Sequence, residues 1–344
     1  MLGNGRTMWV VLAGGVLLAV LLVFVFQGNR SDETLSPSVF QHVESVRLGV
    51  PLQPTSALAL IALEQGLFKR HGLDPVISYY PSGKRALLDG FYQDKVDIAI
   101  ATEVPVTFGV LNQKPFKIVA SLFSADNVNR IVARVDSGIN TPKDLRGKRI
   151  GTQHSSAVHY FLHLFLLEHG LLENEIEFKY MKAEQLVDSL NKGEIDAFSM
   201  REPYVSQATE LLADNAIVFD APGLYQQFDL MVATPGLVAN KPYILERLLA
   251  ALLDAEQLAT NQPDRAIDIV SKALGVSRED IDDIWPTLNV SVSLGQAHLI
   301  VFESESRWAI QNGLTDADSV PDFLMYIHPD SLLKVRPGTV TMIH

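Results

Sequence analysis

The sequence predicts an α/β protein with two lobes of similar topology around a cleft. Short apolar runs, typical of buried strands, alternate with longer amphipathic runs, typical of helices. The order strand–helix–strand–helix–strand occurs over residues 46–101 and again over residues 148–199. This alternation favours parallel sheets, and ligands of such sheets bind beyond the carboxyl ends of the strands.

In the first occurrence of this order, which we call the first pass, three expected strands are separated by two expected helices. The first helix follows Thr55 and Ser56, whose side chains are typical of helix N-caps. The strands are expected at residues 46–50, 76–80 and 96–101, and the helices at residues 57–70 and 84–92.

The second pass repeats this order, and its first helix follows Ser155 and Ser156. The strands are expected at residues 149–151, 176–180 and 195–199, and the helices at residues 157–169 and 183–191. After residue 221 one more strand precedes a run of helices. That strand is expected at residues 230–233, and the helices at residues 242–260, 264–274, 278–284 and 294–310.

The two passes correspond at a nearly constant spacing, which favours an internal repeat over chance similarity. Several residues of the first pass, residues 46–101, recur about one hundred residues later in a similar sequence context. The matched pairs are Gly49 with Gly151, Ser56 with Ser156, Tyr79 with Tyr180, Asp97 with Asp196, and Glu103 with Glu202.

Composition excludes several classes of protein. The 344 residues contain 28 Lys and Arg against 40 Asp and Glu, a net charge of −12. This acidic balance lacks the basic footprint of a nucleic-acid-binding protein. There is no cysteine, so disulfides, Cys-ligated metals and a Cys nucleophile are all excluded.

The N-terminus has the pattern of a membrane anchor. Residues 8–26 are uncharged and almost wholly apolar, and as a helix they would span about 28 Å, close to a bilayer core. No small-residue cleavage site follows, so we expect residues 1–28 to be an uncleaved anchor; a cleaved signal segment is the alternative. Residues 29–45 are then a linker, and the folded part lies on the extracytoplasmic (periplasmic) face of the membrane.

Four motifs in the expected order resemble one known family. Residues 66–74 read Gly-Leu-Phe-Lys-Arg-His-Gly-Leu-Asp, and residues 141–151 contain Asp-Leu-Arg-Gly-Lys-Arg-Ile-Gly. Residues 193–197 read Gly-Glu-Ile-Asp-Ala, with Glu-Pro at 202–203, and a strand and helix start follow over residues 228–242. The chain therefore resembles the SsuA/THI5-like (NMT1-like) substrate-binding proteins of ABC importers for nitrate, sulfonates, taurine and thiamine-precursor pyrimidines.

The resemblance implies the type II periplasmic-binding-protein fold, with a ligand held between two lobes and delivered to an ABC permease. Residues 46–128 would form the first lobe and residues 129–228 the second. Residues 229–344 would return to the first lobe and add the C-terminal helices. The chain crossings would form the hinge.

Polar residues at two helix starts are the first candidates for ligand binding. Exposed N–H groups and the helix dipole favour an anion at such positions. Each hydroxyl could instead serve only as a helix cap. The candidates are Gln53, Thr55 and Ser56 in the first lobe, and His154, Ser155 and Ser156 in the second.

Charged residues after the third strand of each lobe are the second group of candidates. Thr102 and Glu103 follow one strand, and Arg201 and Glu202 follow the other, at positions that face the cleft in the family. Arg201 could bind a sulfonate or carboxylate with two hydrogen bonds, and either glutamate could bind a ligand ammonium. The alternative for each is a surface or interlobe ion pair. The family often has an aromatic residue before Glu-Pro, where this chain has Met200 and Arg201, so the ligand class stays open.

Neither metal binding nor catalysis is predicted. His159 and His163 have the i, i+4 spacing of a helical metal pair, but their helix is otherwise apolar. No G-x-S-x-G, P-loop or H-E-x-x-H motif is present. We therefore expect no cofactor and no enzymatic activity, and a pyrimidine-synthase-like enzyme is the least favoured function.

Together with these patterns, the family resemblance implies an extracytoplasmic solute-binding protein that delivers a small polar organic ligand to an ABC importer. Charges of both signs favour a sulfonate- or taurine-like zwitterion or a thiamine-precursor-like pyrimidine. A membrane-anchored ligand sensor with the same binding fold is the alternative from a different functional class.

Overall fold

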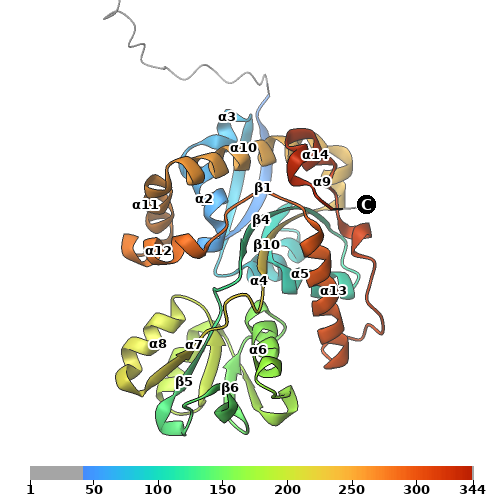
Figure 1. The fold of residues 1–344 in the computed structure, drawn as a ribbon. Coiled ribbons are helices and arrows are strands. Elements are labelled where there is room, and N and C mark those ends of the chain that lie inside the picture. The colour runs from blue at the N-terminus through green and yellow to red at the C-terminus, as the bar shows by residue number, and fades with distance from the viewer. Residues whose placement is uncertain (1–41, 343–344) are drawn as a thin grey trace, which may run out of the picture. The chain divides into compact units, whose positions relative to one another are not determined.

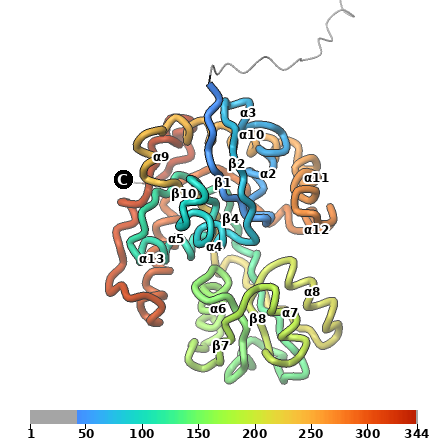
Figure 2. The backbone as a smooth tube through the Cα atoms, turned by 180° about the vertical axis from the view of Figure 1, so that it is seen from behind, coloured from blue at the N-terminus to red at the C-terminus, as the bar shows by residue number. Residues whose placement is uncertain are grey.

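The computed structural model describes residues 42–342, which contain two five-stranded mixed sheets with helices packed around each (Figures 1 and 2). The first sheet has the strand order β2-β1-β3-β10-β4, and the second has the order β7-β6-β8-β5-β9. The first comprises β1 (Glu44–Pro51), β2 (Leu73–Tyr80), β3 (Ile98–Thr102), β4 (Lys117–Ala125) and β10 (Gln227–Ala233). The second comprises β5 (Arg130–Arg134), β6 (Arg149–Thr152), β7 (Glu177–Tyr180), β8 (Ala197–Met200) and β9 (Ala216–Phe219).

Strand pairing confirms the internal repeat. In the first sheet β1 is parallel to β2 and β3, whereas β10 is antiparallel to β3 and β4. In the second sheet β6 is parallel to β7 and β8, whereas β5 is antiparallel to β8 and β9. The register agrees residue by residue, since the neighbours of Gly49 are Ser78 and Ala99, and those of Gly151 are Lys179 and Phe198. Tyr79 and Tyr180 therefore occupy equivalent positions.

An equivalent ion pair fixes the third parallel strand in each sheet. The Arg47 side chain donates to both carboxylate oxygens of Asp97 at 3.0 and 2.6 Å. Arg149 does the same to Asp196 at 3.1 and 2.7 Å. Two-pronged pairing of this kind is directional, so it fixes strand register as well as adding stability.

The helices follow the predicted order, with two breaks that the sequence pattern did not predict. The expected helix at residues 57–70 is divided into α2 (Ala57–Glu64) and α3 (Leu67–Arg70), because Gly66 between them has φ +63°. The expected helix at residues 84–92 is only one turn of α-helix, α4 (Gly83–Arg85), followed by π and 3₁₀ turns. The Tyr80 hydroxyl would lie 2.5 Å from a Cβ at Gly90, so close packing against β2 requires glycine in these turns.

The remaining helices complete both lobes. Those that position the site are α5 (Glu103–Leu111), α6 (Ala157–Glu168), α8 (Tyr204–Leu212) and α13 (Gln296–Gln311). The others are α7 (Ala183–Asn191), α9 (Pro235–Asn240), α10 (Pro242–Asn261), α11 (Pro263–Leu274), α12 (Arg278–Ile284) and α14 (Asp330–Val335).

Helix α13 connects the C-terminal part of the chain to the second sheet. Trp308 on α13 is buried in one apolar cluster with Val104 of α5 and with Tyr160 of α6. The Trp308 indole N–H donates to Glu173 at 2.8 Å, and the Tyr160 hydroxyl lies 2.7 Å from the Ser304 hydroxyl. The C-terminal segment thus packs against both lobes.

The predicted membrane anchor lies outside the described residues. Within residues 42–342, no helix has both the length and the apolar character needed to cross a bilayer.

Candidate ligand-binding site

Polar side chains from both lobes come together where β1, β3 and β8 end. We call this set the interlobe polar group. The first lobe contributes the turn after β1, the end of β3, the start of α5 and the strand β10. The second lobe contributes the residue after β8, and one more member directly precedes β5. Its members are Gln53, Thr55, Ser56, Thr102, Glu103, Asn129, Arg201, Gln227 and Asp229.

Arg201 is the cation of the interlobe polar group. It is partly buried, and its Nη2 donates to Oε1 of Gln53 in the other lobe at 3.4 Å. Burial lowers the pKa of Arg201, whereas the negative charges of Asp229 and Glu103 raise it. A guanidinium remains protonated in proteins, so it brings a full positive charge to the first lobe.

Asp229 is the anion that faces Arg201, and it was not among the residues predicted from the sequence. It lies on β10, is fully buried, and its Oδ2 accepts a hydrogen bond from the Thr55 hydroxyl at 2.5 Å. Its Oδ1 has no hydrogen-bond partner among the described residues. Burial raises the pKa of Asp229, while the Thr55 hydroxyl, the Arg201 charge and the nearby Gln227 amide lower it. The family motif at residues 228–242 includes this position, but that stretch was interpreted only as a strand and a helix start, and its polar residue was not among the predicted site residues.

Glu103 occupies the first position of α5 and is also fully buried. Its Oε2 accepts a hydrogen bond from the backbone N–H of Phe228 at 2.9 Å, which connects α5 to the start of β10. Burial and the nearby charge of Glu305 raise the pKa of Glu103 well above its ordinary value.

Several buried polar atoms in the interlobe polar group lack a partner among the described residues. Buried polar groups are normally hydrogen-bonded, so unpaired donors and acceptors in one place indicate where a ligand or water would bind. The set includes both kinds, which suits a ligand that itself has donors and acceptors. The atoms are Ser56 Oγ, Glu103 Oε1, Asn129 Oδ1, Gln227 Nε2 and Asp229 Oδ1.

Neither of the paired serines caps its helix. The Ser56 hydroxyl is unpaired, and the Ser156 hydroxyl donates to the backbone oxygen of Gln153 at 2.6 Å. The sequence left open that these hydroxyls serve only as helix caps. In the structure neither hydroxyl caps its helix.

Lys84 connects the second lobe's helix start to the first lobe. Its Nζ donates to the backbone oxygens of His154 at 2.5 Å and Ser155 at 3.3 Å. The Ser155 hydroxyl lies 2.9 Å from Nδ1 of His154, and Ser155 adopts φ +50°. Lys84 was not among the predicted site residues, although it is the first residue of the helix expected at residues 84–92.

Glu202 contacts its own helix rather than the interlobe polar group. Its Oε2 accepts hydrogen bonds from the Ser206 backbone N–H at 3.1 Å and hydroxyl at 2.8 Å. The carboxylate therefore accepts from a backbone N–H in the first turn of α8, which has no acceptor within the helix, as acidic side chains at helix N-termini commonly do. Thr102 is buried at the end of β3, beside Asp229 in the sheet register.

The histidines of α6 belong to a ring cluster. His159 is fully buried against Phe178, Tyr180 and Trp308, with ring centroids 5.0 to 5.3 Å apart. Burial lowers its pKa to about 4, so the ring is neutral near pH 7. Across residues 42–342, no three His, Asp or Glu side chains are grouped closely enough to hold a metal ion.

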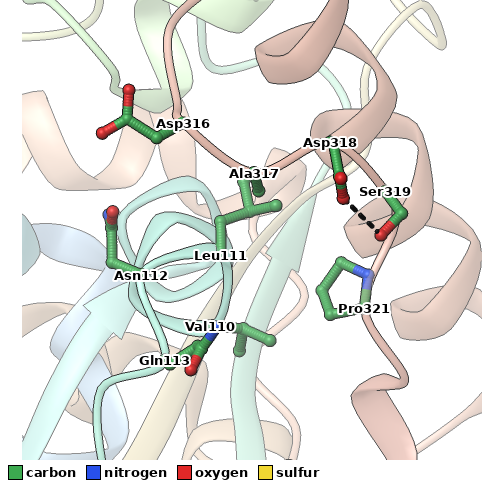
Figure 3. A pocket seen from close by; sticks show the side chains of 9 residues that line it. All are labelled: Val110, Leu111, Asn112, Gln113, Asp316, Ala317, Asp318, Ser319 and Pro321. Atoms are coloured by element: carbon green, nitrogen blue, oxygen red, sulfur yellow. Dashed lines mark hydrogen bonds between the residues drawn. The ribbon is translucent and has the colours of Figure 1, made fainter.

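A separate surface pocket lies at the carboxyl end of α5 (Figure 3). Its volume is about 460 Å³, and its wall is formed by residues 110–113, residues 316–319 and Pro321. Asp318 accepts a hydrogen bond from the Ser319 hydroxyl at 3.0 Å. None of its lining residues belongs to the interlobe polar group.

Family membership is assigned from a sequence match that covers most of the described residues. The sequence model described as NMT1/THI5 like matches residues 53–266, more than half of the chain. The chain belongs to the NMT1/THI5-like family. This confirms the resemblance carried by the four motifs, and the match begins at Gln53 of the interlobe polar group.

Curated relatives of this family member include binding proteins. A binding protein of Brucella abortus (strain 2308) is 23% identical over 240 residues, which cover 66% of this chain and 70% of the relative. A protein of Escherichia coli K12 assigned to the binding of aliphatic sulfonates is 21% identical over 258 residues, with 74% and 80% covered.

Solved structures share the fold. The alkanesulfonate-binding protein SsuA from Xanthomonas axonopodis pv. citri, bound to MOPS, has a TM-score of 0.72 and 17% identity, covering 84% of this chain and 100% of SsuA. The desulfurization enzyme DSZB has a TM-score of 0.61 and 17% identity, covering 85% and 98%. Both binding proteins and an enzyme thus adopt this fold, and function has to be argued from the site.

Proposed function

We propose that this NMT1/THI5-like protein is an extracytoplasmic solute-binding protein that delivers a small polar organic ligand to an ABC importer. The observation that supports this most directly is the pairing of Arg201 from one lobe with Gln53 from the other. A ligand that contacts both lobes stabilises the arrangement in which they are together, and this is how two-lobed receptors couple binding to closure.

The charges of the interlobe polar group favour an organic zwitterion. Arg201 offers donors to an anionic headgroup, and the unpaired Oδ1 of Asp229 offers an acceptor to an ammonium. The sulfonate-binding relatives support a sulfonate as the anionic part. A thiamine-precursor-like pyrimidine, with ring nitrogens and an amino group, is the alternative ligand of the same site.

In this proposal the protein binds its ligand without catalysing a reaction, and it acts at the membrane. An enzyme of the same fold, DSZB, has been studied as a Cys→Ser variant with bound biphenyl-2-sulfinic acid, whereas this chain has no cysteine in any position. The apolar segment at residues 8–26 supports anchoring on the extracytoplasmic face, beside the permease that would receive the ligand.

Mass spectrometry of small molecules that co-purify with the full chain tests this proposal. We expect a zwitterionic sulfonate or an aminopyrimidine at about one molecule per chain, and one-to-one binding of the same compound by titration calorimetry. Chemical turnover of that compound during incubation would contradict the binding-protein proposal and favour an enzyme.

A further inference from the structure

Two buried carboxyl groups meet beside the interlobe polar group, on α5 and on α13. Glu103 and Glu305 are both fully buried. Oε2 of Glu103 accepts from the Phe228 backbone N–H at 2.9 Å, and Oε2 of Glu305 accepts from the Thr107 hydroxyl at 2.6 Å. Protein donors therefore hold one oxygen of each carboxyl group.

The other oxygen of each carboxyl group has no protein donor. Oε1 of Glu103 and Oε1 of Glu305 lack a partner among the described residues. Thr107 lies one helical turn after Glu103 on α5, so its hydrogen bond to Glu305 places the two carboxyl groups next to each other, where one can hydrogen-bond to the other. Two carboxylates cannot form that bond, because both are acceptors, whereas one proton makes either group a donor.

The surroundings strongly disfavour two negative charges at this position. Asp229 on β10 adds a third carboxylate, the Tyr160 hydroxyl faces the pair from α6, and Arg201 after β8 supplies one positive charge. Burial raises the pKa of Glu305 to about 8, and burial together with Glu305 raises the pKa of Glu103. Neighbouring carboxyl groups that share a site titrate as a pair, and one proton is retained far above the usual range.

We propose that Glu305 is a positioning residue of the ligand site, which shares one proton with Glu103 and thereby makes affinity for an anionic ligand depend on pH. With the proton in place, the pair carries one negative charge, and the donors of Arg201 remain available to an anion. Loss of the proton at alkaline pH adds a second negative charge beside Arg201, which opposes anion binding. This inference rests on the proposed function, because its main readout is ligand affinity.

Ethanesulfonate is the appropriate probe, because its charge does not change between pH 6 and 9. Titration calorimetry with the full chain should give an affinity that falls about tenfold as the pH rises from 7 to 9, as expected for one added charge near the anion. Glu305→Gln should remove this slope, since glutamine keeps a donor and cannot ionise. The control is Glu303→Gln, two residues away on α13, where an exposed carboxylate pairs with Arg307; it should keep the slope.

Carbon NMR of the full chain labelled at the glutamate side-chain carboxyls tests the shared proton without any ligand. We expect one carboxyl signal to titrate far above the usual glutamate range and to disappear in both Glu305→Gln and Glu103→Gln. If all glutamates titrate normally, or if Glu305→Gln keeps the wild-type pH slope, the proposal is wrong. If no sulfonate binds at any pH but the NMR signal behaves as expected, the proposed ligand class fails and the shared proton stands.

Discussion

Arg201 of the second lobe donates a hydrogen bond to Gln53 of the first lobe across 3.4 Å. This contact joins the residue after β8 in the second sheet to the turn after β1 in the first sheet. A distance of 3.4 Å makes this a long hydrogen bond, so a ligand oxygen with better geometry could replace the Gln53 acceptor. The contact therefore indicates where an anionic ligand would enter.

Arg201→Ala should weaken binding of the cognate ligand about tenfold to a hundredfold, because a charge-assisted hydrogen bond contributes about 1.5–3 kcal/mol. Titration calorimetry at pH 7 measures the change. Lys192→Ala removes an exposed cation of the same lobe and is the matched control, for which we expect unchanged affinity. Equal affinity in Arg201→Ala and wild type would show that Arg201 does not bind the ligand.

Asp229→Asn should discriminate between ligands with and without an ammonium group. Taurine and ethanesulfonate share the sulfonate, so a role for Asp229 in binding the cation predicts a loss of about tenfold or more for taurine alone. Competition binding with both compounds measures this ratio. An equal loss for both would assign Asp229 a structural role through Thr55, with which it shares a hydrogen bond.

The ion pairs of the two sheets predict acid sensitivity. Hydrogen bonds from Arg47 and Arg149 lower the pKa values of Asp97 and Asp196. As pH falls into the ordinary aspartate range near about 4, the unfolded chain takes up protons before the folded chain does, so the free energy of unfolding decreases.

Asp196→Asn tests this linkage in one sheet. Its loss of stability at pH 7 should be about 1 kcal/mol, because Arg149 is partly exposed to solvent, and the difference from wild type should shrink toward pH 3. Urea unfolding at several pH values measures both effects. A difference that stays constant with pH would contradict the assignment of the acid sensitivity to this pair.

Trp308→Phe should destabilise the packing of α13 on the second lobe. The substitution keeps an aromatic ring in the cluster but removes the donor to Glu173, which costs about 1–2 kcal/mol when the acceptor stays buried. Phe302→Leu, a buried change on the first-lobe side of the same helix, provides a comparison. If Trp308→Phe leaves the urea midpoint unchanged, the hydrogen bond to Glu173 does not hold the helix in place.

Much of the fold was predictable because its signals are local in the sequence. A repeated sequence pattern predicted the parallel strands and the correspondence between the two sheets. It occurs around Gly49 and Gly151, and again around Asp97 and Asp196. The breaks at Gly66 and around Gly90 were not predicted, since they depend on backbone torsion and on close packing against Tyr80.

The site was predictable only in part. Gln53, Thr55 and Glu103 follow the neighbouring strands β1 and β3, so strand order in the first sheet places them near one another, and Arg201 was predicted from its place after the corresponding strand of the second sheet. Asp229 and Glu305 come from the return strand and from α13, more than 100 residues from Glu103, and nothing in their local sequence indicates burial or shared protons. Such contacts depend on tertiary packing, which the amphipathic pattern does not specify.

A crystal structure of the full chain with its co-purified ligand tests the central claim most directly. The account predicts electron density for the ligand against the Arg201 guanidinium, within hydrogen-bond distance of Ser56 and of Oδ1 of Asp229. Ligand density elsewhere, such as in the pocket at the carboxyl end of α5 (Figure 3), with Arg201 still bonded to Gln53, would contradict it.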